Sequence, residues 1–166
     1  FSVDLLPAAG QTLVGYRAKP HAGVIDLGKI GHYAPGDFWE EVHGDSGHII
    51  LDPGAFYILV SREAVHSPPN DAAEMAPYLA MVGEFRVHYA GFFDPGFGHD
   101  GAGGAGSRGV LEVRCHEAPF VLEHGQIVGR LVYERMDARP ERLYGAALAS
   151  NYQGQGLKLS KHFRTA

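Results

Sequence analysis

A glutamate interrupts an apolar run in the segment "GVLEVRC", residues 109–115, and its position raises a question of chemistry. Side chains of an extended strand point alternately to its two faces. One face of this predicted strand would carry Leu111, Val113 and Cys115. The other face would carry Val110, Glu112 and Arg114. Glu112 is therefore either a solvated carboxylate that pairs with Arg114 or a buried acid that transfers protons.

Two further segments contain residue types that are typical of ligand sites. The segment "FFDPGFG", residues 92–98, places Asp94 at a Pro-Gly turn. The segment "NYQGQG", residues 151–156, places side-chain amides beside glycines, which allow a ligand to approach the backbone closely. Either segment alone is typical of an ordinary turn, but together with Glu112 they define a candidate site.

The sequence argues against several other kinds of catalytic site. Its ten histidines occur singly, without the HxH or HExxH spacing of common metal sites. Cys115 is the only cysteine, which excludes an internal disulfide and a CxxC metal site. The Gly-rich segment 98–109 precedes a predicted strand instead of a helix, so we interpret it as a flexible loop and not as a dinucleotide cradle.

Composition and charge narrow the class of protein. A chain of 166 residues predicts one domain with its own core, spanning residues 1–166. The net charge is −5, and no basic stripe with interleaved aromatic residues occurs, so we expect no nucleic-acid partner. We find no apolar run long enough to cross a bilayer and no secretory signal, so we expect no membrane partner. The single cysteine fits the reducing cytoplasm, where we expect the protein to act.

The C-terminal segment "GLKLSKHFR", residues 156–164, is the one locally basic part of the chain. Its cations are Lys158, Lys161 and Arg164. We predict a solvated, frayed terminus here, because chain ends that nothing ties down are seldom ordered. The alternative is a flap that covers an anionic ligand.

Short runs of Val, Ile, Phe and Tyr, separated by turn residues, predict an all-β fold. The chain contains 23 Gly and 10 Pro, which recur in segments such as "LDPGAF" and "FDPGFGHDG". Many short strands joined by turns are typical of a sandwich, a jelly roll or a barrel. We expect one or two short helices. The best candidate is residues 70–83, which Asn70 or Asp71 would cap and Pro77 would interrupt.

Four segments in the same order resemble the dCTP deaminase branch of the dUTPase/dCTP deaminase superfamily. The family pattern has an Asp-Pro-Gly hairpin, a Val-Leu-Glu strand, a Gly-Gln segment and a final Tyr-Gln-x-Gln. The corresponding segments here are "AGFFDPGFG" (90–98), "VLEV" (110–113), "APFVLEHGQIVGRLVYE" (118–134) and "NYQGQ" (151–155). The resemblance covers residues 51–161, whereas residues 1–50 match only weakly, as N-terminal strands and a linker.

The resemblance implies a distorted jelly roll of the dUTPase-like β-clip type. It also implies a homotrimer, or a pseudo-symmetric assembly with an N-terminal half, with nucleotide sites between subunits. The implied reaction is the metal-independent hydrolytic deamination of dCTP to dUTP and ammonia. The resemblance implies no tightly bound cofactor, and Mg²⁺ would arrive with the triphosphate. The basic tail would then be a flap over that triphosphate.

The resemblance also implies roles for six residues. Glu112 would carry protons from the attacking water to the cytosine ring, which one carboxylate can do if it reaches both partners. The backbone groups of Ala90 and Val110 would hold the base and the water. The positions beside the sugar and the phosphates are Asp94, Tyr144 and Gln155.

The chain departs from the family pattern in three places. Pro77 and Met81 stand where the family carries an Arg-Ser-Ser run and a further Arg, and Asn151 stands where a phosphate-binding lysine is usual. The chain also starts at Phe1 instead of Met. These departures lead to the hypothesis that the chain is the C-terminal half of a tandem bacterial form, whose N-terminal half supplies the missing Ser-Ser and Arg.

Two other functions remain open at this point. A dUTPase-like nucleotide pyrophosphatase needs a hairpin tyrosine after the aspartate, and Phe97 does not supply one. A non-catalytic half, which builds an oligomer or binds nucleotide, is favoured by the missing Ser-Ser and Arg.

Overall fold

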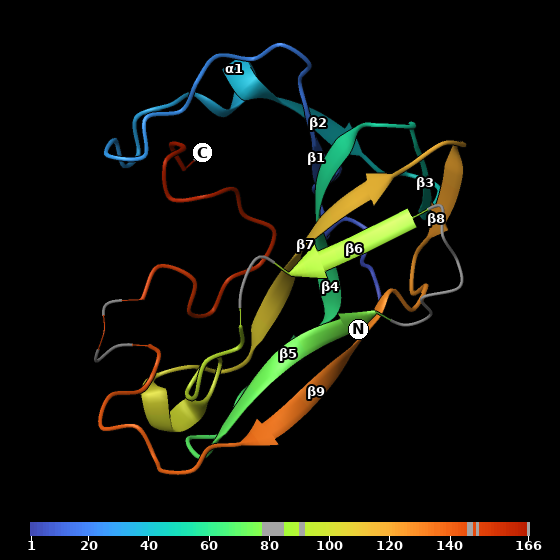
Figure 1. Cartoon of the computed structure of the whole chain (residues 1–166). Coiled ribbons are helices and arrows are strands. Elements are labelled where there is room, and N and C mark those ends of the chain that lie inside the picture. Colours follow the sequence, from blue (N-terminus) through green and yellow to red (C-terminus); the bar gives the residue numbers. More distant parts are fainter. Residues whose placement is uncertain (78–84, 90–91, 146–147, 149, 166) are drawn as a thin grey trace.

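Antiparallel strands dominate this chain, and the all-β prediction is confirmed (Figure 1). The computed structural model describes residues 1–77, 85–89, 92–145, 148 and 150–165. Its main sheet has five strands in the order β2-β1-β4-β7-β6. These strands are β1 (Leu13–Ala18), β2 (Trp39–His43), β4 (Phe56–Val65), β6 (Phe85–Tyr89) and β7 (Ser107–Cys115). All four pairs of neighbours in this sheet are antiparallel.

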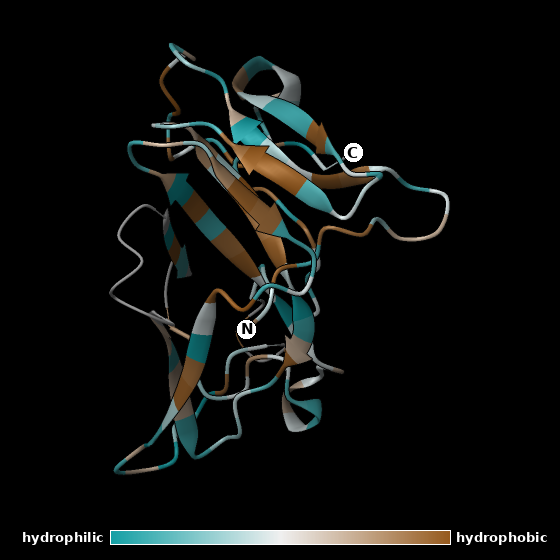
Figure 2. Ribbon diagram, turned by 90° about the vertical axis from the view of Figure 1, so that its right-hand side faces the viewer, coloured by the Kyte–Doolittle hydropathy of each residue, from teal (hydrophilic) through white to brown (hydrophobic). Residues whose placement is uncertain are grey.

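Two smaller sheets accompany the main sheet. Strand β3 (His48–Leu51) pairs with β8 (Phe120–Glu123), and β5 (Asp71–Pro77) pairs with β9 (Gly129–Arg135). In Figure 1 the β5–β9 pair runs below the main sheet. Hydrophobic and hydrophilic residues alternate along several strands (Figure 2), as expected for strands with one face in the core.

The core lies against one face of β7. Leu111, Val113 and Cys115 are buried, as the alternation of the sequence predicts. They pack with buried residues of the neighbouring strands and of the β3–β8 pair, among them Leu51, Leu59 and Leu122. The opposite face of β7 is therefore the face that carries Glu112.

The helix predicted over residues 70–83 is wrong for the part that the structure describes. Residues Asp71–Pro77 form β5, and every one of them has a partner on β9, from Asp71 opposite Arg135 to Pro77 opposite Gly129. Ala73 and Met75, two residues apart, contact the aromatic cluster of Phe93 and Phe97, which is a strand period and not a helical one. Residues 78–83 lie outside the described residues.

The helical elements whose bounds the structure describes are single turns. These are α1 (Pro35–Phe38) and the 3₁₀ turn at Asp100–Ala102. Neither is long or apolar enough to cross a membrane. The 3₁₀ turn lies within the segment 98–109 that we interpreted as a loop, and β7 already begins at Ser107, so the strand starts earlier than predicted.

Gly98 permits a close approach of two backbones beside this turn. Its φ is +66°, and a Cβ atom there would lie 2.3 Å from the carbonyl oxygen of Val65. Other residues are strained in this conformation and too large for this space. Glycine is thus required where the chain enters the segment before β7.

The C-terminal segment is packed, so the prediction of a frayed terminus is wrong. Leu159 and Phe163 are buried. Phe163 forms a parallel bridge with Tyr33, and its ring packs against Tyr33, Phe38 and Trp39. The tail therefore lies on the segment that precedes β2, and the two together cover the outer face of the main sheet (Figure 1).

Candidate active site

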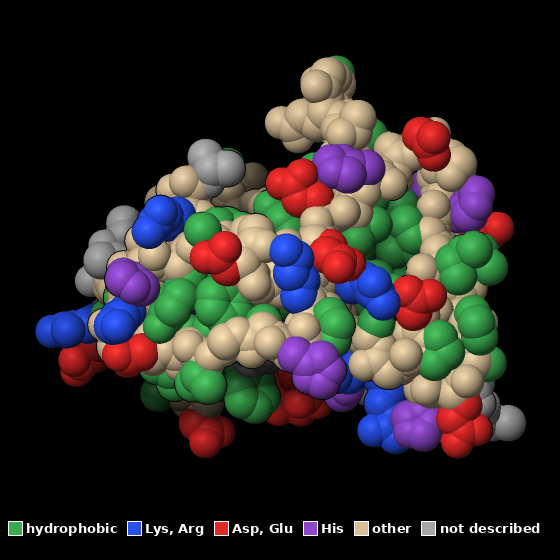
Figure 3. Space-filling view, turned by 90° about the horizontal axis from the view of Figure 1, so that it is seen from above, with side chains coloured by type: hydrophobic (Ala, Val, Ile, Leu, Met, Phe, Trp, Pro, Cys, Tyr) green, Lys and Arg blue, Asp and Glu red, His purple; other side chains and the backbone are tan. Residues whose placement is uncertain are grey.

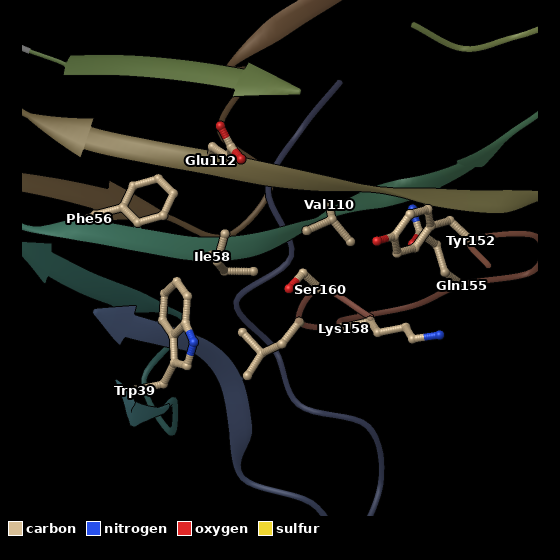
Figure 4. A pocket seen from close by; sticks show the side chains of 10 residues that line it. Trp39, Phe56, Ile58, Val110, Glu112, Tyr152, Gln155, Lys158 and Ser160 are labelled. Carbon is tan, nitrogen blue, oxygen red and sulfur yellow. The ribbon is translucent and has the colours of Figure 1, made fainter. Parts of the chain in front are cut away.

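A cavity of about 240 Å³ lies between the outer face of the main sheet and the C-terminal segment (Figure 4). We call it the Glu112 cavity. Its sheet wall consists of Trp39, Phe56, Ile58, Val110 and Glu112. Its tail wall consists of Tyr152, Gln155, Lys158, Leu159 and Ser160. An apolar wall thus carries one acid, and it faces a wall that is mostly polar.

The ladder of the main sheet places Glu112 on the cavity side. Ile58 of β4 and His88 of β6 lie directly opposite Glu112 on its two sides. Residues that are directly opposite in an antiparallel pair project to the same face. Glu112 is half-buried, and within the described residues it makes no hydrogen bond or ion pair. Its carboxylate is thus available to a ligand.

The two arginines closest to Glu112 in sequence bind elsewhere. The guanidinium carbon of Arg114 lies 4.4 Å from the centre of the Phe56 ring, in a cation–π contact. Arg108 pairs with the carboxylate of Asp4, and its Nε donates to the carbonyl oxygen of Ser61 at 2.6 Å. A pair between Glu112 and Arg114, one of the two alternatives that the sequence leaves open, is therefore absent from the ion pairs of the described residues.

Gln155 fixes the tail wall to β7. Its carbonyl oxygen accepts a hydrogen bond from the backbone N–H of Arg108 at 3.0 Å, and its side-chain Nε2 donates to the carbonyl oxygen of Arg108 at 3.3 Å. Gln155 is 9% exposed. The structure thus brings Gln155 into the same cavity as Glu112 and Val110.

Lys158 is at the polar end of the tail wall. Its Nζ donates to the main-chain oxygen of Asn151 at 3.1 Å and lies 5.8 Å from the centre of the Tyr152 ring. Figure 4 shows this ammonium on the side of Tyr152 and Gln155, away from the Glu112 carboxylate. The cavity therefore has an acidic end and a basic end.

Asp94 and Tyr144 form a second group beside the cavity. The backbone N–H of Tyr144 donates to the carbonyl oxygen of Pro95 at 2.8 Å, and its ring packs on Phe97. Burial raises the pKa of the Tyr144 hydroxyl, and the charges of Tyr152 and Asp94 raise it further, against a backbone hydrogen bond from Tyr152. Tyr144 thus joins the exposed Asp94 turn to Tyr152, which lines the cavity.

The remaining sequence predictions fall outside these two groups. Ala90, expected to hold the base or the water, lies outside the described residues, as does Met81. Pro77 is the last residue of β5. Within the described residues, no group of three or more His, Cys, Asp or Glu side chains lies where it could bind a metal ion.

Trp39 is the main residue of the cavity that sequence reasoning missed. Its ring lies 5.9 Å from that of Phe56 and 6.1 Å from that of Phe163, between centroids. Its buried indole N–H has no hydrogen-bond partner within the described residues. The available signal was that Trp39 is the only tryptophan of the chain, next to an aromatic Phe38 at the start of a strand.

Comparison with known proteins connects this geometry to a family. The family described as "2'-deoxycytidine 5'-triphosphate deaminase (DCD), C-terminal domain" matches residues 1–163. The chain belongs to this family. The resemblance found in residues 51–161 is confirmed, and the match of the dCTP deaminase C-terminal domain also includes residues 1–50 and therefore Trp39.

Individual dCTP deaminases are similar to the chain over different lengths. The dCTP deaminase of Natronomonas pharaonis is 29% identical over 129 residues, which are 72% of this chain and 59% of that protein. The protein named "dCTP deaminase, dUMP-forming" of Methanothermobacter thermautotrophicus is 30% identical over 161 residues, 93% of this chain and 74% of that protein.

A solved structure is also similar. The crystal structure of 2'-deoxycytidine 5'-triphosphate deaminase from Agrobacterium tumefaciens has a TM-score of 0.76 and 60% sequence identity. The similarity covers 84% of this chain and 42% of the A. tumefaciens chain. The chain therefore spans less than half the length of this dCTP deaminase.

Proposed function

We propose that the protein containing this chain hydrolyses dCTP to dUTP and ammonia, and that this chain supplies the catalytic glutamate, Glu112. The observation that carries the proposal is the place of Glu112, which is half-buried and unpaired at one end of a cavity formed by β4, β7 and the C-terminal segment. Membership of the dCTP deaminase family supplies the substrate class.

The reaction requires one group that can first accept a proton and then donate it. A water molecule adds to C4 of the cytosine ring, and the Glu112 carboxylate accepts one proton of the water and passes it to N3. The carboxylate then accepts the proton of the new C4 hydroxyl and passes it to the C4 amino group, so that the C–N bond breaks, ammonia leaves and a carbonyl oxygen remains. A carboxylate within hydrogen-bond reach of the water and the ring can perform both transfers.

The surroundings of Glu112 support this role. Arg108 and Arg114 bind other groups, so neither neutralises the carboxylate in the described structure. Backbone groups of β7 near Val110 are proposed to hold the base and the water, since fixed dipoles stabilise charge that develops in a transition state. Ala90 is proposed to assist in the same way.

The dCTP would extend from Glu112 towards the second group of residues. We place the sugar beside the Asp94 turn and the phosphates near Tyr144 and Gln155, with Mg²⁺ bound to the triphosphate as part of the substrate. Support comes from Tyr144, which connects the Asp94 turn with Tyr152 of the cavity.

We propose that a second part of the protein completes the site. Pro77 ends β5, and this chain carries Pro77 and Met81 where the family has Arg-Ser-Ser and a further Arg. An N-terminal half of a tandem form would supply these groups, in a trimer or a pseudo-symmetric assembly with sites between subunits.

Replacement of Glu112 tests the proposal in the intact protein. Glu112→Gln keeps the size of the side chain and removes the proton acceptor, so ammonia release from dCTP should fall by about 10²–10⁴-fold. Binding of dCTP, measured by calorimetry, should change little. The matched control is Glu134→Gln, an exposed acid on β9, which should keep full activity. Near-normal ammonia release by Glu112→Gln would contradict the assignment.

The product of the reaction needs a separate measurement. Two relatives are named dUMP-forming, so dCTP turnover should be followed by both ammonia and pyrophosphate. The proposal expects one ammonia per dCTP and no pyrophosphate, with dUTP as the product. Stoichiometric pyrophosphate would show that the protein also cleaves the phosphate chain.

A further inference from the structure

Charge is distributed unevenly along the Glu112 cavity. Among the described residues that line it, Glu112 is the only acid and Lys158 the only base. Apolar side chains occupy the wall between them, including Ile58, Val110 and Leu159 (Figure 4). Such a cavity fits a ligand with a hydrogen-bonding ring at one end and an anionic group at the other.

The Lys158 ammonium has unused hydrogen-bonding capacity. An ammonium carries three donors, and here the main-chain oxygen of Asn151 accepts one of them. Within the described residues, Lys158 makes no ion pair, and the side chain is half-buried. A half-buried cation that lacks a carboxylate partner favours the binding of an anion.

The fold places the Lys158 ammonium close to residue 151, where the family pattern has a lysine and this chain has Asn151. Asn151 has a neutral side chain, but the segment 151–158 curves so that the Nζ of Lys158 lies 3.1 Å from the main-chain oxygen of Asn151. The contact between Lys158 and the Tyr152 ring holds the ammonium on the same side. A positive charge is thus present beside residue 151, although residue 151 does not carry it.

The other cations of the tail have different surroundings. Lys161 is exposed and does not line the cavity, and its backbone N–H faces the hydroxyl of Tyr152. The Nε of Arg164 donates to the carbonyl oxygen of His32 at 3.1 Å. Charge is also mixed on the face of the molecule shown in Figure 3, where acidic and basic side chains are interspersed. Local geometry therefore singles out Lys158.

We infer that Lys158 is a phosphate-binding residue of this site and replaces the lysine that the chain lacks at position 151. The inference rests on the proposed function, because it assigns one end of the cavity to the triphosphate of dCTP. The ammonium would donate to the phosphate oxygens while Glu112 acts at the ring. Lys158 is a binding residue here and takes no part in the proton transfers.

Two ligands that differ only in the triphosphate test the inference in the intact protein. Calorimetric titrations with dCTP and with deoxycytidine would compare the unchanged protein with Lys158→Gln and Lys158→Arg. A lost charge-assisted hydrogen bond should weaken dCTP binding by about tenfold or more in Lys158→Gln. Deoxycytidine, which has no phosphate, should bind with an unchanged Kd. Lys158→Arg keeps the charge and should recover part of the dCTP affinity.

Lys161→Gln is the matched control, since it removes the same charge from the same segment at a position outside the cavity. It should leave both affinities unchanged. Equal loss of dCTP and deoxycytidine binding in Lys158→Gln would assign Lys158 a structural role and overturn the inference, as would unchanged dCTP binding. Failure of the unchanged protein to bind dCTP would instead overturn the proposed function, and the inference with it.

Discussion

Main-chain ladders hold the sheet wall of the Glu112 cavity, whereas separate hydrogen bonds and the packing of aromatic side chains hold the tail wall. On the sheet side, β7 pairs with β4 from Ser107 to Arg114 and with β6 from Leu111 to Cys115, and Leu111 behind Glu112 is fully buried. On the tail side, Phe163 packs against rings of the segment before β2. The tail has no strand of its own among the described elements.

This difference separates two tasks of the site. A proton-transferring carboxylate needs a fixed position, because small displacements of a reacting group reduce the rate strongly. Glu112 has such a position on a central strand. Groups that bind and release a ligand can lie on a segment with a lower local stability. Gln155 and Lys158 lie on such a segment.

Leu111→Ala should lower the free energy of unfolding more than the other variants, because it removes packing directly behind the sheet wall. Leu111 is 0% exposed, and a cavity at such a site lowers the free energy of unfolding by about 2–5 kcal/mol. Urea unfolding followed by circular dichroism would measure the loss. Leu6→Ala is the control, since Leu6 is 51% exposed and its truncation should change the free energy of unfolding much less. A small loss in Leu111→Ala would mean that the sheet wall is not the rigid part.

Phe163→Ala should release the tail wall while the sheet remains folded. We expect dCTP binding to weaken by about tenfold, because losing the buried ring removes the anchor of the segment that carries Gln155 and Lys158. The midpoint of global unfolding should fall less than in Leu111→Ala. Trp39 is the only tryptophan and contacts Phe163, so its fluorescence should report the release directly.

The control for this variant is Phe92→Ala, because Phe92 is 69% exposed and lies outside the aromatic cluster of the tail. Its tryptophan emission should match that of the unchanged protein. If Phe163→Ala lowered global stability as much as Leu111→Ala, the two walls would belong to one cooperative unit and the comparison would be wrong.

Acid should remove one small contribution to the stability of the sheet side, the smallest of the three effects. Burial raises the pKa of Glu63, at the far end of β4, but hydrogen bonds from the hydroxyl and the N–H of Ser2 lower it more, so its net pKa lies below 4.5. A carboxyl with a lowered folded-state pKa stabilises the fold above its unfolded value, and this contribution is lost as the pH falls through the folded value.

Ser2→Ala should therefore lower the Tm by about 1–3 °C near neutral pH and by progressively less below pH 4.5. Thermal scans from pH 3 to 7 would measure this, with the exposed Ser46→Ala as the control. A difference in Tm between Ser2→Ala and the unchanged protein that stays constant over this range would exclude a contribution from Glu63.

Local patterns in the sequence predicted the sheet wall better than the tail wall. The alternation of Leu111, Val113 and Cys115 with Glu112 depends only on the geometry of a single strand, so it is visible in a few residues. The segment Asp71–Pro77 was predicted incorrectly because its strand partner, β9, lies far along the chain. Cross-strand pairing of this kind overrides the local helical preference.

The tail and Trp39 were missed for a related reason. Phe163 is flanked by charged residues, so its sequence neighbourhood is typical of a solvated terminus. Its burial depends on rings from residues 33–39, which only the folded chain brings near it. The expected roles of Asp94 and Tyr144 came from the family resemblance, since no local pattern predicts that Tyr144 lies near both Asp94 and Tyr152.

Four main-chain hydrogen bonds connect segment 31–33 with residues 161–164. The N–H groups of Gly31 and His32 donate to the carbonyl oxygens of Lys161 and His162, and the N–H of Arg164 donates to that of Tyr33, each at 2.9 Å. The N–H of Tyr33 donates to the carbonyl oxygen of His162 at 3.1 Å. No one of these amides can meet solvent without separation of both segments. Their deuterium uptake should therefore follow a single shared opening rate, and that rate would set how often the cavity is accessible from its outer side.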